Sequence, residues 1–239
     1  MQPITRREAL SLGAFSTAAS LTPSATRSRR ASMLTRPTPN TGRALAVAGL
    51  GFAWSRVPTI AVLGAPDDPR QVLVRDAVTF WNQTLSELGS GFRLGDVTRQ
   101  EGSIPDDLVV SLSQATLSGR RQPLPEPLAA VAGDIVIVLS DVDFISFSQH
   151  WPIEKGLVAI KSGRALPMTL PNVARNVIAH ELGHSIGLGH NADPTMLMCG
   201  RPAPCRPTEF QSATEHYFPL TAEEKALLLQ LYPADWHPR

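Results

Sequence analysis

Three of the six histidines of this chain lie within eleven residues, in the stretch H-E-L-G-H-S-I-G-L-G-H from His180 to His190. Each imidazole carries two polar nitrogens that must find partners when the side chain is buried, so a hydrophobic core has little use for such a cluster. A bound metal ion would satisfy all three rings at once. The stretch therefore predicts a metal site.

The spacing of the histidines indicates how they would converge on one ion. His180 and His184 are four residues apart, which places both imidazoles on one face of a helix with β-carbons about 6 Å apart. A helix continuing to His190 would carry that residue about 15 Å further along the axis. Gly187 is where the helix can end, because glycine accepts the left-handed conformation that turns the chain back. We therefore expect His180, His184 and His190 to be the metal ligands.

Three protein ligands leave one position of a tetrahedral zinc ion for water, which is typical of a catalytic site rather than a structural one. Glu181, next to the first ligand, could accept a proton from that water and later return it to a leaving amine. The predicted reaction is peptide hydrolysis, with one catalytic zinc ion and with Glu181 as general base and then general acid.

The motif H-E-x-x-H-x-x-G-x-x-H with a methionine downstream resembles the signature of the metzincin metallopeptidases. Met198 stands eight residues after His190, a spacing similar to that of the matrixin branch. The resemblance implies that Met198 forms an apolar floor below the histidines, with Met196 as a second candidate. It also implies an α+β fold: a twisted mixed sheet of four to five strands with two helices, then a C-terminal subdomain with the methionine turn and a final helix.

The sequence departs from the matrixin pattern in several places. No cysteine precedes Cys199, so a pro-segment that covers the zinc with a cysteine is not expected. Position 200 is glycine, where some metzincins carry a tyrosine ligand, so no fifth protein ligand is assigned. The loops that bind calcium or a second zinc in matrixins are not clearly reproduced, and structural metals stay open. The candidates for such a site are Asp141, Asp143 and His150.

The two cysteines, Cys199 and Cys205, directly follow the methionine turn. An even pair in an exported chain suggests a disulfide that closes a small loop, and two free thiols are the alternative. In metzincins the segment that follows, here residues 200–220, forms a wall of the pocket for the substrate residue after the cleaved bond. The resemblance thus implies that Tyr217 and Phe218 contribute to specificity.

Hydrophobic patterning predicts the strands that must position these residues. Short apolar runs bounded by Gly, Pro or Ser cover residues 57–64, 91–98, 107–114, 134–141 and 156–162. Metzincin substrates lie along an exposed sheet edge, where pairing through main-chain hydrogen bonds tolerates many sequences. Residues 134–141 and 156–162 are the candidates for this edge, although the apolar density of the first is typical of a strand buried on both faces.

Three helices are expected. A long amphipathic helix lies within residues 65–89, and a second carries His180 and His184. The last begins at a capping box formed by Thr221 and Glu224 and ends at Pro233. The apolar stripe of the second helix consists of Val173, Val177, Ile178 and Leu182.

The N-terminal residues differ in composition from the rest. Residues 1–43 contain seven arginines and one acidic residue and lack apolar periodicity. Arg6 and Arg7 precede a weakly apolar run, which resembles a twin-arginine export signal. We predict an export signal and disordered linker over residues 1–53, a catalytic domain over residues 54–239, and a periplasmic or extracellular protein. The alternatives are an organelle transit peptide, a start at Met33 followed by a secretory signal, and plain disorder.

Charge and composition narrow the choice of partners. The net charge of +1 gives no electrostatic reason to expect nucleic acid or acidic membranes. No run approaches the roughly 18 apolar residues of a membrane-spanning helix. We therefore expect a monomer whose partner is a protein or peptide substrate in extended conformation.

The leading hypothesis is thus an exported zinc endopeptidase. One alternative is a non-catalytic zinc protein that binds extended peptides, against which the presence of Glu181 argues. Another is a zinc hydrolase of a small amide, which the motif alone permits. The natural substrate, the cleavage preference and the control of activity are not specified by the sequence.

Overall fold

The computed structural model describes residues 49–152, 155–200, 203–205 and 211–239. The predicted export signal falls within residues 1–48, outside the described residues, and the domain boundary at residue 54 stays a prediction. The elements follow one another as β1 (Ile60–Leu63), α1 (Arg70–Glu87), β2 (Val97–Arg99), α2 (Asp106–Leu117), α3 (Glu126–Ala129), β3 (Ile135–Leu139), β4 (Phe147–Trp151), β5 (Lys155–Ile160), α4 (Pro171–Ser185) and α5 (Ala222–Leu231).

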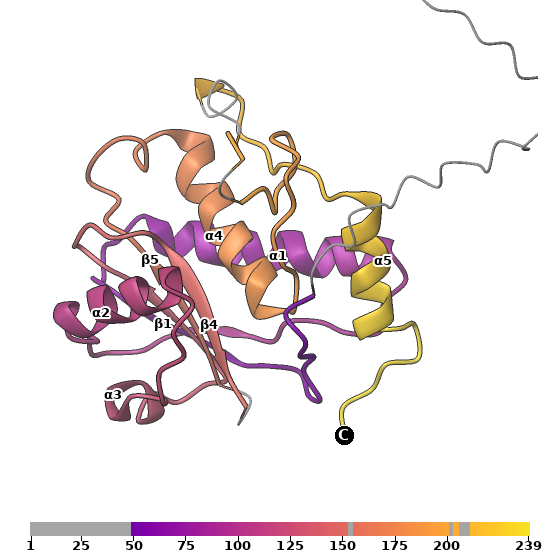
Figure 1. The fold of residues 1–239 in the computed structure, drawn as a ribbon, viewed down its shortest axis with the longest axis horizontal. Coiled ribbons are helices and arrows are strands. Elements are labelled where there is room, and N and C mark those ends of the chain that lie inside the picture. The colour runs from indigo at the N-terminus through magenta and orange to yellow at the C-terminus, as the bar shows by residue number, and fades with distance from the viewer. Residues whose placement is uncertain (1–48, 153–154, 201–202, 206–210) are drawn as a thin grey trace, which may run out of the picture. The chain divides into compact units, whose positions relative to one another are not determined.

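A five-stranded mixed sheet lies between two groups of helices (Figure 1). The strand order is β2-β1-β3-β5-β4, and all neighbours pair in parallel except β4, which is antiparallel to β5. Every residue of β1, β3 and β5 is buried, as expected for parallel strands covered on both faces. The predicted mixed sheet of four to five strands is therefore confirmed.

Helices α1 and α4 cover one face of the sheet. Their apolar side chains join those of alternate residues on β1, β3 and β5 in one buried cluster. Trp81 of α1 is fully buried, and its Nε1 donates a hydrogen bond to the Ala179 carbonyl of α4 at 2.9 Å. Because burying one large apolar side chain contributes about 1.5–3 kcal/mol, this layer holds α4 firmly against the sheet. It thereby fixes the helix that carries His180 and His184.

Helices α2 and α3 cover the opposite face, where the sequence predicted neither. Residues 107–114, expected as a strand, lie within α2, so that expectation was wrong. Val109, Leu112 and Ala115 are buried at intervals of three, a helical spacing that the run of apolar residues obscures. Pro105 precedes the helix, and Asp106 and Asp107 occupy its first turn, where negative charge is favourable.

The edges of the sheet also differ from expectation. Residues 134–141 and 156–162 contain β3 and β5, which are both interior strands, so neither is the exposed edge. The edge on that side is β4, which the sequence did not predict because its central residues, Ser148, Gln149 and His150, are polar and half-buried. At the other edge, only residues 97–98 of the strand expected over 91–98 belong to β2.

The helices expected at residues 65–89 and after Thr221 are confirmed as α1 and α5. The predicted capping box is present, because Thr221 Oγ1 accepts a hydrogen bond from Glu224 N and a Glu224 oxygen accepts one from Thr221 N. No helix in the described part of the chain is both long and apolar enough to cross a membrane.

Candidate metal centre

His180 and His184 lie one turn apart on α4, and their outer ring nitrogens are both anchored. His180 Nδ1 lies 2.8 Å from the Leu197 carbonyl, and His184 Nδ1 lies 2.7 Å from the Leu188 carbonyl. A carbonyl oxygen can only accept, so both Nδ1 atoms carry the proton. These two bonds fix the orientation of the rings, and an imidazole oriented in this way can bind a cation through Nε2.

The helix ends as the sequence predicted, at Gly187. Gly187 has a φ of 102°, its N–H donates to the His184 carbonyl at 3.0 Å, and the Leu188 N–H donates to the Gly183 carbonyl at 3.1 Å. This pair of bonds is the Schellman motif, which ends a helix through a left-handed residue. The chain turns back at this point and brings His190 towards the helix.

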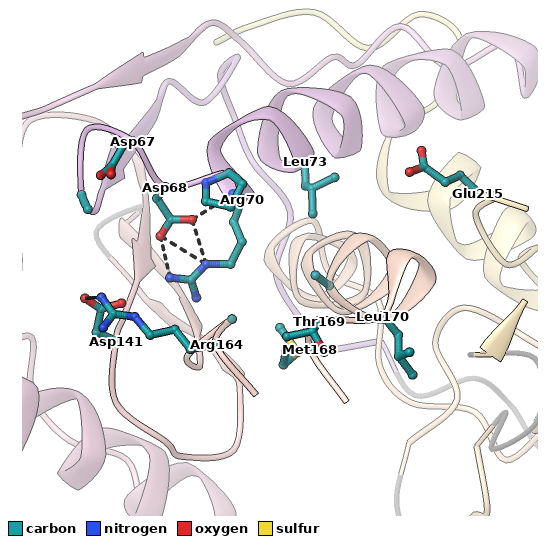
Figure 2. A pocket seen from close by; sticks show the side chains of 14 residues that line it. Asp67, Asp68, Arg70, Leu73, Asp141, Arg164, Met168, Thr169, Leu170 and Glu215 are labelled. Carbon is teal, nitrogen blue, oxygen red and sulfur yellow. Dashed lines mark hydrogen bonds and ion pairs between the residues drawn. The ribbon is translucent and has the colours of Figure 1, made fainter. Parts of the chain in front are cut away.

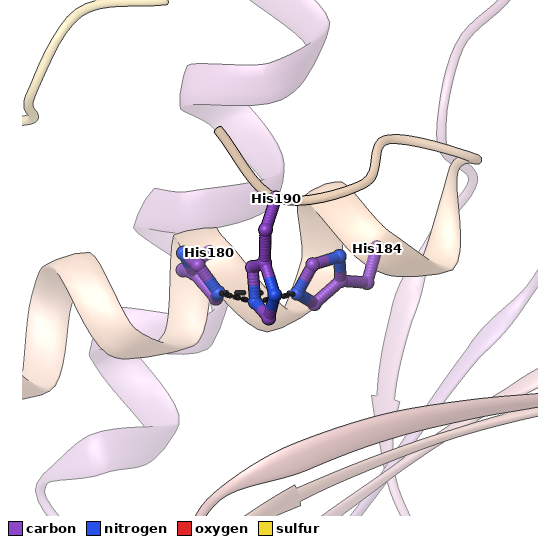
Figure 3. A group of neighbouring side chains, drawn as sticks. All are labelled: His180, His184 and His190. Carbon is purple, nitrogen blue, oxygen red and sulfur yellow. Dashed lines mark hydrogen bonds between the residues drawn. The ribbon is translucent and has the colours of Figure 1, made fainter. Parts of the chain in front are cut away.

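The three imidazoles converge on one point (Figure 3). The Nε2 atoms are separated by 3.1 Å between His180 and His184, 3.2 Å between His180 and His190, and 2.9 Å between His184 and His190. Among the described residues, this is the group of histidines, cysteines and acids that could hold a metal ion. The geometry thus brings together all three predicted ligands.

The protonation of the rings makes this point attractive to a cation. Burial lowers the pKa of His184 to about 4 and also lowers the pKa of His190, so the neutral forms are favoured. With their protons on Nδ1, His180 and His184 turn two Nε2 lone pairs towards each other, and neither can donate. Two acceptors about 3 Å apart repel each other, and either a bound cation or a hydrogen donated by His190 Nε2 relieves this repulsion.

Two glycines, Gly200 and Gly183, leave space for side chains of the site. A methyl group at position 200 would lie 2.1 Å from His190 Cγ, so the third imidazole lies directly against Gly200. A methyl group at position 183 would lie 2.5 Å from Met198 Sδ, so the methionine packs against Gly183, between His180 and His184 in sequence. Met198 is fully buried, whereas Met196 is only half-buried, which favours Met198 as the apolar floor.

The methionine turn also holds the ligands through its backbone. The Leu197 carbonyl binds His180, and the Met198 carbonyl accepts a hydrogen bond from Asn191 N at 2.9 Å. The next residue, Cys199, forms a disulfide with Cys205, as the even cysteine pair suggested. One short segment therefore supports both the helical and the non-helical ligands.

Glu181 lies in a small cavity that His180 also lines. Its side chain is almost fully buried, and the residue lines a cavity of about 290 Å³ together with His180. Burial raises the pKa of Glu181 to about 8. A neighbouring cation would favour the carboxylate and lower this pKa. The other walls are mostly apolar and include Phe144, Ile145, Pro167, Met168, Val173 and Val177.

A larger cavity of about 550 Å³ contains none of the three histidines (Figure 2). Its wall includes the buried ion pair of Asp68 and Arg70. The Arg70 guanidinium also donates to the Ser140 and Lys161 carbonyls, which follow β3 and β5. This arginine is therefore already paired within the protein and joins the start of α1 to the sheet.

The structure does not bring the candidates for a structural metal together. Asp141 pairs with Arg164, and Asp143 pairs with Lys161. His150 stacks on Phe52 with ring centroids 3.7 Å apart. Each of these three side chains thus has a different contact, and in the described part of the chain they do not form a common metal site.

Tyr217 and Phe218, the two residues expected to shape specificity, both pack against other parts of the protein. Tyr217 stacks on Phe80 of α1, with ring centroids 4.2 Å apart, and Phe218 is buried in the core. Neither residue lines the cavity beside Glu181. The walls of this cavity come from α4, from residues 144–146, from the loop before α4 and from Cys199.

Two buried asparagines of α4, which the sequence analysis missed, hold the segment that contains Phe218. Asn172 Nδ2 donates to the Ser212 and Thr214 carbonyls, and its Oδ1 accepts from His216 N. Asn176 one turn later binds the His216 carbonyl and Phe218 N in the same way. The signal available was two asparagines four residues apart on a largely buried helix, because buried amides need polar partners.

Among protein-family profiles and curated protein sequences, none matches this chain. In structure the chain is similar to archaemetzincin from Methanopyrus kandleri, with a TM-score of 0.44 and 16% sequence identity. The match covers 72% of this chain and 93% of that chain. At this degree of overlap the likeness carries no functional weight, so the case for a metal centre rests on the three imidazoles.

Proposed function

We propose that this chain is a zinc-dependent endopeptidase of the metzincin type, similar to the matrixin branch. The observation that carries the proposal is the convergence of three imidazole Nε2 atoms within 3.2 Å of one another, with Glu181 buried in a cavity that His180 also lines. A site built only to bind metal would not need a carboxylate at this position.

The donor set favours zinc among the divalent ions. Three neutral imidazoles suit zinc, whereas calcium and magnesium prefer oxygen ligands. Nitrogens around a tetrahedral zinc ion with bonds of 2.0–2.1 Å stand about 3.4 Å apart, close to the separations of the three Nε2 atoms. When bound, the ion would supply Lewis-acid polarisation of the attacking water and of the scissile carbonyl.

Glu181 would move the protons of the reaction. Its carboxylate accepts a proton from the attacking water as the C–O bond forms, and then donates that proton to the nitrogen as the C–N bond breaks. The mostly apolar walls of the cavity lower the local polarity around Glu181, which strengthens electrostatic interactions there. His180 and His184 keep their orientation throughout, because their Nδ1–H groups continue to donate hydrogen bonds to backbone carbonyls.

The substrate proposed for this site is an extended peptide. β4 is the sheet edge beside β5, and residues 144–146, which lead into β4, line the cavity that contains His180 and Glu181. A peptide paired with this edge could therefore place a side chain in the cavity.

The test uses Glu181→Gln, which keeps the size of the side chain but removes the base. We expect the variant to bind zinc with unchanged stoichiometry and to lose at least 100-fold in kcat against unfolded protein and a peptide library. Glu223→Gln, an exposed glutamate on α5, serves as the matched control and should cleave as the wild type does.

The same assay separates the alternatives. Zinc binding without cleavage by the wild type would favour a peptide-binding protein, and cleavage of small amides alone would favour the other hydrolase. Equal cleavage by wild type and Glu181→Gln would remove Glu181 from the mechanism.

We also propose export through a twin-arginine signal, which rests on Arg6 and Arg7. The double variant Arg6→Lys, Arg7→Lys should accumulate in the compartment of synthesis with its leader intact. N-terminal sequencing of exported wild type would locate the cleavage point. Unchanged export of the double variant would contradict this route.

A further inference from the structure

Asn191 connects the third histidine to the last helix. It follows His190 directly, and its Nδ2 donates to Glu224 Oε1 at a distance of 2.6 Å. Glu224 lies on α5 and is fully buried. A carboxyl oxygen buried this deeply would be left without a partner if the hydrogen bond were lost, which is energetically costly. The contact therefore ties the loop that carries His190 to a helix far away in sequence.

The two oxygens of Glu224 have different partners. Oε2 accepts a hydrogen bond from Thr221 N at 2.8 Å, which completes the capping box of α5. Oε1 accepts from Asn191, which lies outside the helix. The cap requires only the first of these contacts, so the contact with Asn191 needs a separate explanation.

His190 needs such support more than the other two ligands do. His180 and His184 are held by the regular geometry of α4, whereas His190 follows the end of that helix and has no helical neighbours to hold it. The backbone of Asn191 pairs with the methionine turn, because Asn191 N donates to the Met198 carbonyl and Gly200 N donates to the Asn191 carbonyl at 3.1 Å. With its side chain on Glu224, Asn191 is held at three points.

We propose that Glu224 and Asn191 are positioning residues for the metal ligand His190, an inference that rests on the proposed metal site. The buried carboxylate holds the Asn191 side chain, and Asn191 sets the position of the adjoining His190 backbone. The third Nε2 is thereby kept within reach of the other two. Without this link the loop can move and metal affinity falls, although the helical pair of ligands is unchanged.

The experiment compares zinc affinities of the full-length wild type, Asn191→Ala, Glu224→Ala, the double variant and Thr221→Ala. Affinity is measured by competition with a chromophoric chelator, and the Co²⁺ absorption spectrum reports the ligand geometry. We expect Asn191→Ala and Glu224→Ala each to weaken zinc binding on the order of 10-fold. The double variant should lose no more, because both changes break one contact.

Thr221→Ala is the matched control, because it removes the hydroxyl of the cap and leaves the Asn191–Glu224 contact in place. It should lower the melting temperature while zinc affinity stays within twofold of the wild type. Equal losses of affinity in Thr221→Ala and Glu224→Ala would show that only helix stability matters and would overturn the inference.

Asn191→Ala leaves the capping box of α5 intact. This variant therefore tests the positioning of His190 even if Glu224→Ala fails to fold. Wild-type affinity and an unchanged Co²⁺ spectrum in Asn191→Ala would overturn the inference while leaving the proposed function intact. A wild type that binds no zinc would overturn both.

Discussion

Gly200 lies where a side chain would displace the imidazole of His190. The sequence shows only that a tyrosine is absent at this position. In the structure the His190 ring occupies the space that a β-carbon of residue 200 would fill. Gly183 has the same relation to Met198 on the other side of the site. At the residue scale, the candidate site therefore depends on these two glycines as well as on the three histidines, because the glycines have no side chain that would collide with His190 or Met198.

Gly200→Ala should weaken zinc binding by at least about 10-fold, because the methyl group forces the His190 ring out of position. Titration with zinc in the presence of a competing chelator measures the change. Gly156→Ala is the matched control, since its methyl group would meet Ile135 Cγ1 at an ordinary 3.7 Å. Similar affinities in the two variants would contradict the proposed crowding of His190.

At the scale of elements, local signals were reliable where they mark the ends of helices. Gly187 and the pair of Thr221 and Glu224 act through bonds to residues a few positions away, so the sequence alone locates them. For residues 107–114 the local signal was misleading, because a short apolar run is compatible with a strand and with a buried helix. Their position on the second face of the sheet selects the helix.

Gly187→Ala should destabilise the fold more than Gly89→Ala, although both glycines follow a helix with positive φ. Left-handed backbone costs an alanine about 1–2 kcal/mol at either site. At Gly187 the methyl group would also approach Phe52 O at 2.9 Å and Leu231 Cδ1 at 2.8 Å, whereas nothing lies within 4 Å at Gly89. Such crowding adds about 1–3 kcal/mol.

Urea denaturation of both variants measures this difference. A free energy of unfolding that falls equally in Gly187→Ala and Gly89→Ala would indicate that the loop before β1 yields to the methyl group at no cost. The cost of a left-handed backbone at alanine would then account for the loss of stability in both variants.

At the scale of the whole domain, Asp134 joins two parts of the sheet that are distant in sequence. Its carboxylate accepts hydrogen bonds from Arg56 at 2.5 Å and from Thr59 N and Oγ1 at 2.8 and 2.9 Å. Burial alone would raise the pKa of Asp134, but these donors outweigh it and hold the pKa below its usual value. The start of β3 is thus fixed to the segment that enters β1.

Asp134→Asn should lower the free energy of unfolding by about 1 kcal/mol at pH 7. Because the folded-state pKa is depressed, the stabilisation is present above the ordinary carboxyl pKa of about 3.9 and is lost as the pH falls through the folded value. The difference between wild type and variant should therefore shrink in acid. Denaturant titrations at pH 7 and pH 3 measure it, and a constant difference would assign the effect to packing.

The sequence by itself determined the chemistry of the candidate site. The spacing of His180, His184 and His190, the break at Gly187 and the place of Glu181 follow from the period of a helix and the freedom of glycine, which are local properties. The tertiary structure decided what surrounds them. It makes β4 the edge of the sheet, packs the His190 ring against Gly200, and forms the hydrogen bond between Asn191 and Glu224. These contacts join residues that meet only after folding, so no local pattern encodes them.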